Sequence, residues 1–108
     1  MRVALSGRTS RRVENVAEWT FLTNHSHVLV CLREDSELRI RDIAERVGIT
    51  ERATQRIVAE LTESGYLEKE REGRRNRYRV IDDRPLRHPL ERSHTIGDLL
   101  TAVASTKP

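Results

Sequence analysis

The sequence predicts an α+β domain that is mainly α, with a core of three helices, a two-stranded β-hairpin and a short C-terminal helix. Residues 40–59 hold two amphipathic segments that meet at a glycine, which indicates two helices joined by a tight turn. Residues 66–81 hold strand-forming side chains on both sides of a Glu-Gly turn signal. Because 108 residues is a usual length for one domain, these elements should share a single core.

The segment 40–59 is expected to form a helix-turn-helix. In its first helix, apolar and small residues recur at helical spacing and share one face: Ile40, Ile43, Ala44 and Val47. Gly48 stands where the helix must end in a left-handed residue, which glycine adopts without a Cβ penalty. The Thr50 hydroxyl can then cap the next helix. A helical hairpin in some other small domain is the alternative interpretation of this pattern.

The second of these helices is expected over residues 51–64, where Gly65 supplies a left-handed end. Its buried stripe is Ala53, Ile57 and Leu61. Thr54 departs from the pattern, because an aliphatic residue usually stands at that position. Its methyl group can still pack if its hydroxyl bonds back to the preceding turn.

An earlier helix is predicted over residues 25–34, with Thr23 or Asn24 as its N-cap. Its buried side is Val28, Leu29, Cys31 and Leu32. Residues 38–40 are expected to be a strand fragment that pairs with the hairpin, and the next helix is expected to begin at residue 41 or 42.

The N-terminal stretch is predicted to be a basic arm over residues 1–12, followed by a short helix over residues 13–21. Trp19 is the only tryptophan of the chain and stands beside Phe21 and Leu22. We expect these side chains to anchor the N-terminal segment on the core, with a role in an interface as the competing interpretation.

The hairpin carries the excess positive charge of the chain. Its basic residues are Lys69, Arg71, Arg74, Arg75, Arg77 and Arg79. Within residues 69–79 only Glu70 and Glu72 oppose these six cations, which leaves a net charge of +4, against +3 for the whole chain. Such a cluster is typical of a surface that binds nucleic acid.

After the hairpin, Pro85 and Pro89 predict an extended linker over residues 82–92 that runs over the surface. Thr95 and Asp98 resemble a capping pair at the start of a short amphipathic helix. The apolar stripe of that helix is Ile96, Leu99, Leu100 and Val103. Such a helix can fold back on its own domain or pair with a second copy, and we favour pairing because a single module binds DNA weakly.

Composition and residue spacing argue against a disulfide-bonded protein, a membrane protein, a metal site and an enzyme. The single cysteine, Cys31, excludes an intrachain disulfide and favours the reducing cytoplasm, while no apolar run is long enough for a membrane span. The histidines at positions 25, 27, 88 and 94 lack the spacing and the acidic or cysteine neighbours of a metal site. Because no catalytic set or phosphate-binding glycine loop is present either, we expect neither an enzyme nor a cofactor.

From Thr23 to Val80 the order of elements resembles that of winged helix-turn-helix transcriptional regulators of the bacterial or archaeal MarR/ArsR-like group. The matching residues are Ile43-Ala44, Val47-Gly48-Ile49-Thr50, Leu61 with Ser64-Gly65-Tyr66-Leu67, and Gly73-Arg74-Arg75-Asn76-Arg77-Tyr78. The resemblance implies a homodimer on a pseudo-palindromic DNA operator, with the third helix in the major groove and the hairpin on the backbone or minor groove. It divides the chain into an arm (1–22), a DNA-binding domain (23–82) and a linker with a short helix (83–108).

On the third helix, the residues expected to contact DNA lie on the outward side near its N-terminus. Arg52, Gln55 and Arg56 are candidates for base readout, because Arg pairs with guanine and Gln with adenine. Thr50 is expected to bond phosphate. Glu51 has two open roles, acceptance of a hydrogen bond from cytosine or a favourable interaction with the helix dipole.

The other candidate contacts lie on the hairpin and beside the second helix. The hairpin residues expected to contact the backbone or minor groove are Arg74, Arg75, Asn76 and Arg77, and those expected to contact phosphate beside the second helix are Arg39 and Arg41. A winged helix can also serve as a protein-docking module without specific DNA binding, and the mixed charge of the third helix leaves this alternative open.

Overall fold

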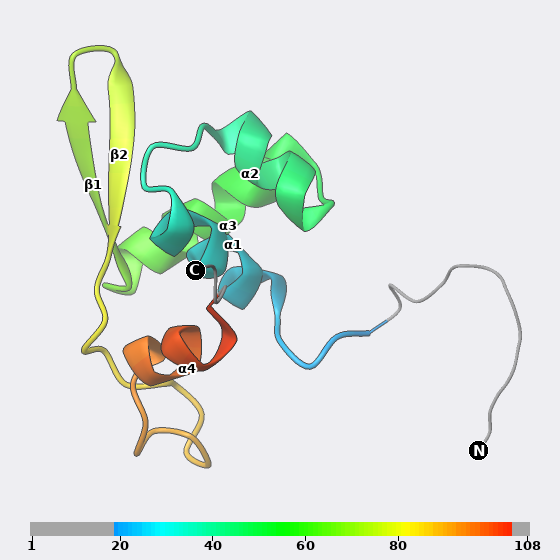
Figure 1. Ribbon diagram of the computed structural model, residues 1–108, viewed down its shortest axis with the longest axis vertical. Helices are drawn as coiled ribbons and strands as arrows, with labels where there is room; N and C mark the ends of the chain where they lie inside the picture. The colour runs from blue at the N-terminus through cyan, green and yellow to red at the C-terminus, as the bar shows by residue number, and fades with distance from the viewer. Residues whose placement is uncertain (1–18, 105–108) are drawn as a thin grey trace, which may run out of the picture.

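The computed structural model describes residues 19–104 of the 108-residue chain. Four helices and one hairpin follow in the order α1 (Asn24–Glu34), α2 (Ile40–Val47), α3 (Glu51–Glu63), β1 (Leu67–Glu72), β2 (Arg75–Val80) and α4 (Ile96–Val103). The hairpin projects from the helical body, while α2 and α4 lie on opposite sides of α1 (Figure 1).

Local signals fix the ends of α1, α2 and α3. The Thr23 hydroxyl accepts a hydrogen bond from the Ser26 N–H and caps α1, as expected. Gly48 ends α2 with φ of 86°, in the left-handed region that favours glycine. The Thr50 hydroxyl accepts from the Ala53 N–H at 3.0 Å and caps α3, and Gly65 follows that helix with φ of 87°. The predicted helix-turn-helix is therefore confirmed.

The hairpin β1–β2 is antiparallel and turns at Gly73, where φ is 60°. The predicted strand fragment at residues 38–40 is wrong, because α2 already begins at Ile40. The side chain of Asp42 accepts a hydrogen bond from the backbone N–H of Arg39. This contact makes Arg39 the N-cap of a helix and not part of a strand. One backbone–backbone hydrogen bond, from the Tyr78 N–H to the Ser36 carbonyl at 3.0 Å, connects this loop to the hairpin.

One core joins all the elements. The side chains that are almost fully enclosed are Val28, Leu29, Leu32, Ile43, Leu67, Leu100 and Thr54. Cys31 is buried with them, as expected for a small apolar side chain. Thr54 lies in the core because its hydroxyl donates to the Thr50 carbonyl at 2.9 Å, which satisfies the polar atom while the methyl group packs.

The segment after the hairpin runs over the surface, as expected, but it consists largely of turns and is not the extended linker that its prolines predict. Pro85 forms an antiparallel bridge with Thr95, and the Tyr66 hydroxyl donates to the Pro85 carbonyl. Thr95 and Asp98 form the predicted capping box of α4.

The apolar stripe of α4 is used within the chain. Ile96 and Leu100 are 5% and 1% exposed and belong to the common core, with α4 packed against α1. The face that we expected to pair with a second copy is therefore occupied by the same chain. Val103, at the end of the helix, is 41% exposed.

The N-terminal expectations have mixed outcomes. The basic arm and most of the short helix predicted over residues 13–21 lie outside the described residues, and residues 19–22 are not helical. The expected anchoring of Trp19 and Phe21 on the core is wrong, because their exposed fractions are 70% and 92%. Between residues 19 and 104, no helix has the length and apolar character needed to cross a membrane.

Taken together, a three-helix core with its helix-turn-helix, a projecting hairpin and a short packed terminal helix constitute a winged helix-turn-helix fold, as predicted. The β1–β2 hairpin is called the wing from here on.

Candidate nucleic-acid interface

The outward face of α3 begins at its capped N-terminus. Arg52, Gln55 and Arg56 are all exposed, whereas Thr54 and Ile57 point into the core. The three exposed residues are spaced at i, i+3 and i+4, so they form one stripe on the helix surface. The structure thus brings together the residues that we predicted for base readout and leaves them open to solvent.

Two further predicted residues, Thr50 and Glu51, are exposed at the start of the same helix. The Thr50 hydroxyl accepts from the Ala53 N–H, so its own proton remains available for donation to a phosphate oxygen. Ala59 is exposed one turn beyond Arg56. Sequence reasoning passed over Ala59 because its side chain carries no polar group, yet a small residue here lets another surface approach the helix closely.

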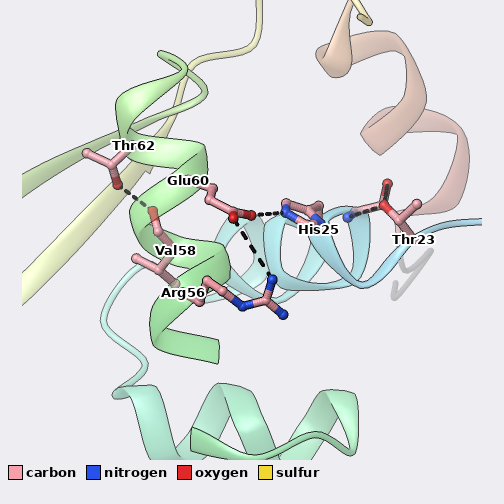
Figure 2. A network of polar contacts seen from close by, with 7 residues as sticks. Thr23, His25, Arg56, Val58, Glu60 and Thr62 are labelled. Atoms are coloured by element: carbon pink, nitrogen blue, oxygen red, sulfur yellow. Dashed lines mark hydrogen bonds and ion pairs between the residues drawn. The ribbon is translucent and has the colours of Figure 1, made fainter. Parts of the chain in front are cut away.

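Arg56 belongs to a polar network with Glu60 and His25, as Figure 2 shows. Glu60 lies one turn further along α3, with its Oε2 atom 3.9 Å from an Arg56 nitrogen, and its Oε1 atom is 2.7 Å from Nε2 of His25 on α1. The hydrogen bond with His25 lowers the pKa of Glu60, and Arg56 adds to this effect. The network orients Arg56 toward α1, whereas no carboxylate of residues 19–104 lies within 4.0 Å of Arg52.

The contact between His25 and Glu60 could not be foreseen, because 35 positions separate these residues in the sequence. Only the packing of α1 on α3 brings them together.

The two faces of the wing differ in charge because strand side chains alternate between faces. The register places three acid–base pairs across one face: Glu68 with Arg79, Glu70 with Arg77, and Glu72 with Arg75. The other face carries Lys69 opposite Tyr78 and Arg71 opposite Asn76. The excess positive charge of the strands therefore lies on the face of Lys69 and Arg71.

Arg77 holds the wing against the loop between α1 and α2. Its guanidinium donates to Glu37 Oε2 at 2.8 Å and lies 3.5 Å from Glu72 Oε2, and the bond to Glu37 raises the pKa of Arg77 further above its ordinary value. The neighbouring Arg75 donates to the Glu37 carbonyl at 3.0 Å. Two of the predicted DNA contacts thus have partners within the chain.

Arg74 occupies the turn of the wing and is exposed, and no carboxylate of the described chain lies within 4.0 Å of it. Lys69 and Arg71 are exposed as well, although we did not include them among the predicted contacts. Their signal was present in the sequence: once Tyr78 faces the core, two-residue alternation and the hairpin register place Lys69 and Arg71 together on one face.

A hollow of about 390 Å³ joins the wing to the start of α2. It is lined by Leu38, Arg39, Arg74, Arg75, Asn76 and Tyr78. The structure thus brings together predicted contacts from two regions, since Arg39 lies beside the turn of the wing. Arg39 is also within 3.9 Å of Asp42, and Arg41 is exposed on the first turn of α2. Asn76 is half-buried, and its Oδ1 atom has no hydrogen-bond partner among the described residues.

Residues 19–104 give little evidence for a metal site or a reactive cysteine. No group of three or more His, Cys, Asp or Glu side chains could hold a metal ion within this range. His27 bonds Asn24, and His94 lies 3.4 Å from Asp98. Burial raises the pKa of the Cys31 thiol, which disfavours the reactive thiolate.

Comparison with known proteins agrees with the fold. Residues 22–68 match the family model described as "Winged helix-turn-helix DNA-binding". The match covers α1, the helix-turn-helix and the start of β1, and ends before the turn of the wing. No curated protein matches the chain. The fold is that of a winged helix-turn-helix, and residues 22–68 are similar to the DNA-binding family of that fold.

Proposed function

We propose that this protein binds double-stranded DNA sequence-specifically and acts as a small transcriptional regulator, with binding rather than catalysis as its activity. The observation that supports this role best is the exposed stripe of Arg52, Gln55 and Arg56 at the capped N-terminal end of α3. The second helix of a helix-turn-helix contacts base edges through its N-terminal residues, which is where these side chains stand.

In this role α3 enters the major groove. Gln55 reads adenine and Arg52 reads guanine through paired hydrogen bonds, while Arg56 reads a base or a phosphate after it leaves Glu60. Thr50 donates its hydroxyl proton to phosphate. Glu51 keeps its two roles, as an acceptor from cytosine or as a favourable charge at the helix N-terminus.

The wing and the start of α2 supply the sequence-independent part of binding. Arg74, with Arg39 and Arg41, contacts the phosphate backbone, and Lys69 and Arg71 face the backbone or minor groove. Arg75, Asn76 and Arg77 contribute mainly by holding the wing in position, since two of them already have partners on the chain.

We further propose a homodimer on a pseudo-palindromic operator, in the cytoplasm, and a place in the MarR/ArsR-like group. Two α3 helices one helical turn apart on DNA would roughly double the set of base contacts. This proposal follows the resemblance in the sequence of the helix-turn-helix and wing.

The test measures operator selection and affinity separately. Bound fragments are selected from genomic DNA with the full-length protein, and the recovered duplex is titrated by gel shift. Arg52→Ala and Gln55→Ala should each cost about 1–3 kcal/mol and relax preference at particular base pairs. Glu63→Ala, an exposed change on the distal end of α3, is the matched control and should leave base preference unchanged.

A second candidate function is protein docking without specific DNA binding. It is favoured by the acidic residues on the exposed side of α3, Glu51, Glu60 and Glu63. Titration with a generic duplex at low salt distinguishes the two functions, because a docking module lacks the steep salt dependence that phosphate contacts impose.

A further inference from the structure

Trp19 and Phe21, called here the aromatic arm, have no place in the DNA-binding surface. Their rings meet edge to face, with centroids 5.0 Å apart and planes at 81°, but they touch each other while remaining 70% and 92% exposed. An isolated exposed apolar residue is ordinary, whereas two adjacent large aromatics indicate an interaction site.

A groove of about 610 Å³ begins at the N-terminal end of the described domain. It is bounded by the first turn of α1, the C-terminal part of α3 and the segment after the wing. Its apolar lining consists of Leu29, Leu61, Tyr66, Leu86 and Ile96. Thr23, only two residues beyond Phe21, lies on its edge. The rest of its lining is polar and includes His25, Glu60, Glu63, Arg87, His88 and Glu91. A groove of this size and mixed character suits an aromatic side chain with a polar edge, such as tryptophan.

We propose that the occupant is the aromatic arm of a second copy of this chain. The two copies would be related by a two-fold axis, so that each places Trp19 and Phe21 in the groove of the other. This arrangement supplies an interface for the dimer of the proposed function. Only the biological use of the dimer rests on that function, because the exchange of arms itself requires no DNA.

The area available is sufficient for a specific dimer. Each aromatic side chain buries about 150–250 Å² when enclosed, so two arms bury roughly 600–1,000 Å². The grooves that receive them lose a smaller area, because most of their apolar lining belongs to the buried core, and the total comes to roughly 900–1,300 Å², a range that includes the ~1,000 Å² that a specific interface needs. A two-fold exchange also uses one patch on both copies and closes without leaving a free site for further chains.

The short distance along the chain favours exchange over docking in the same copy. Residues 21 to 23 span at most about 7 Å, so the arm would have to reverse at Leu22 to enter its own groove. In the structure, Leu22 is half-buried and the arm leads away from the helical body (Figure 1). A neighbouring copy meets no such constraint.

The first experiment uses the full-length protein without DNA. Trp19 is the only tryptophan, so its emission reports on the arm alone. As concentration rises, sedimentation should show a monomer–dimer equilibrium, and over the same range Trp19 emission should move to shorter wavelength and lose access to acrylamide. Phe21→Ser keeps the reporter and should weaken dimerisation at least about tenfold, whereas the control Val103→Ser, on an exposed apolar residue of α4, should not.

Mixing two variants tests which surfaces meet. Phe21→Ser has a defective arm and an intact groove, and Leu86→Lys has an intact arm and a charged groove, so neither should dimerise well alone. Their mixture restores one of the two contacts and should associate more tightly than either variant by itself. Circular dichroism of each variant checks its fold.

Three outcomes would overturn the exchange. A monomer with Trp19 shielded at every concentration places the arm in its own groove. Full dimerisation of Leu86→Lys alone means that the arms of the two copies stack on each other. A monomer with exposed Trp19 at the highest concentration means that the groove binds a different ligand. Gel shifts on the same variants keep this result separate from DNA binding, because a chain that dimerises but ignores all duplexes refutes only the proposed function.

Discussion

Replacement of Leu100 by alanine tests whether α4 is part of the domain core. Leu100 is 1% exposed and lies with Ile96 in the common core. The change removes three carbon atoms, worth about 0.8 kcal/mol each in transfer free energy, so about 2.4 kcal/mol is lost before any cavity forms. With a partly collapsed cavity, the free energy of unfolding should fall by about 3 kcal/mol.

A loss of that size is readily measured. For a domain of this length it lowers the melting temperature by roughly 12–24 °C, and urea titration followed by circular dichroism gives the free energy directly. Leu90→Ala is the matched control, because Leu90 is 89% exposed on the segment before α4 and its truncation should stay within about 0.5 kcal/mol.

The reasoning fails if Leu100→Ala is as mild as Leu90→Ala. It also fails if the loss appears only at concentrations where the protein is dimeric, because the side chain would then be buried between copies and not within one.

The remaining predictions concern the cap, the wing and the α1–α3 contact. Thr50→Ala should cost about 1 kcal/mol in unfolding free energy through the lost cap, measured by urea titration, whereas Thr50→Ser should restore most of it. Lys69→Ala should lower the slope of log DNA affinity against log salt concentration by about 1. Arg77→Ala should mainly loosen the wing, which faster amide hydrogen exchange in β2 would show. Equal salt slopes for the two variants would contradict the assignment of the two faces. The pKa of Glu60 is lowered from 4.5, so its charged form stabilises the fold above that pH. The stability advantage of the wild-type protein over Glu60→Gln should therefore vanish as pH falls through the lowered pKa. Urea midpoints of both proteins from about pH 6 to about pH 3 measure this, and a difference that stays constant with pH would refute it.

Elements whose signals are local could be predicted from the sequence. Gly48 and Gly65 end helices because only glycine enters the left-handed region at no cost, and the threonine at position 50 begins α3 through its own hydroxyl. These signals determine where α2 and α3 begin or end without knowledge of the rest of the chain. The hairpin register follows as readily from its turn at Gly73.

What could not be predicted depends on contacts between distant positions. Arg77 and Glu37 are 40 residues apart, so nothing local indicated that this arginine anchors the wing. Trp19 and Phe21 were expected to anchor the N-terminal segment on the core, but the sequence cannot show whether the surface of the core has a place for them. For Leu100, helical periodicity identified an apolar face without identifying what covers it.

The unequal faces of the wing constrain which substitutions this hairpin can accept during evolution. A charge reversal at position 68, 70 or 72 places like charges across the ribbon unless position 79, 77 or 75 reverses as well, so these sites should covary in pairs among homologues. Positions 69 and 71 have no acidic counterpart in the register and are free to change one at a time. The overall strength of the proposed DNA binding can therefore change through Lys69 and Arg71 one residue at a time, whereas the opposite side of the ribbon changes by compensated exchange.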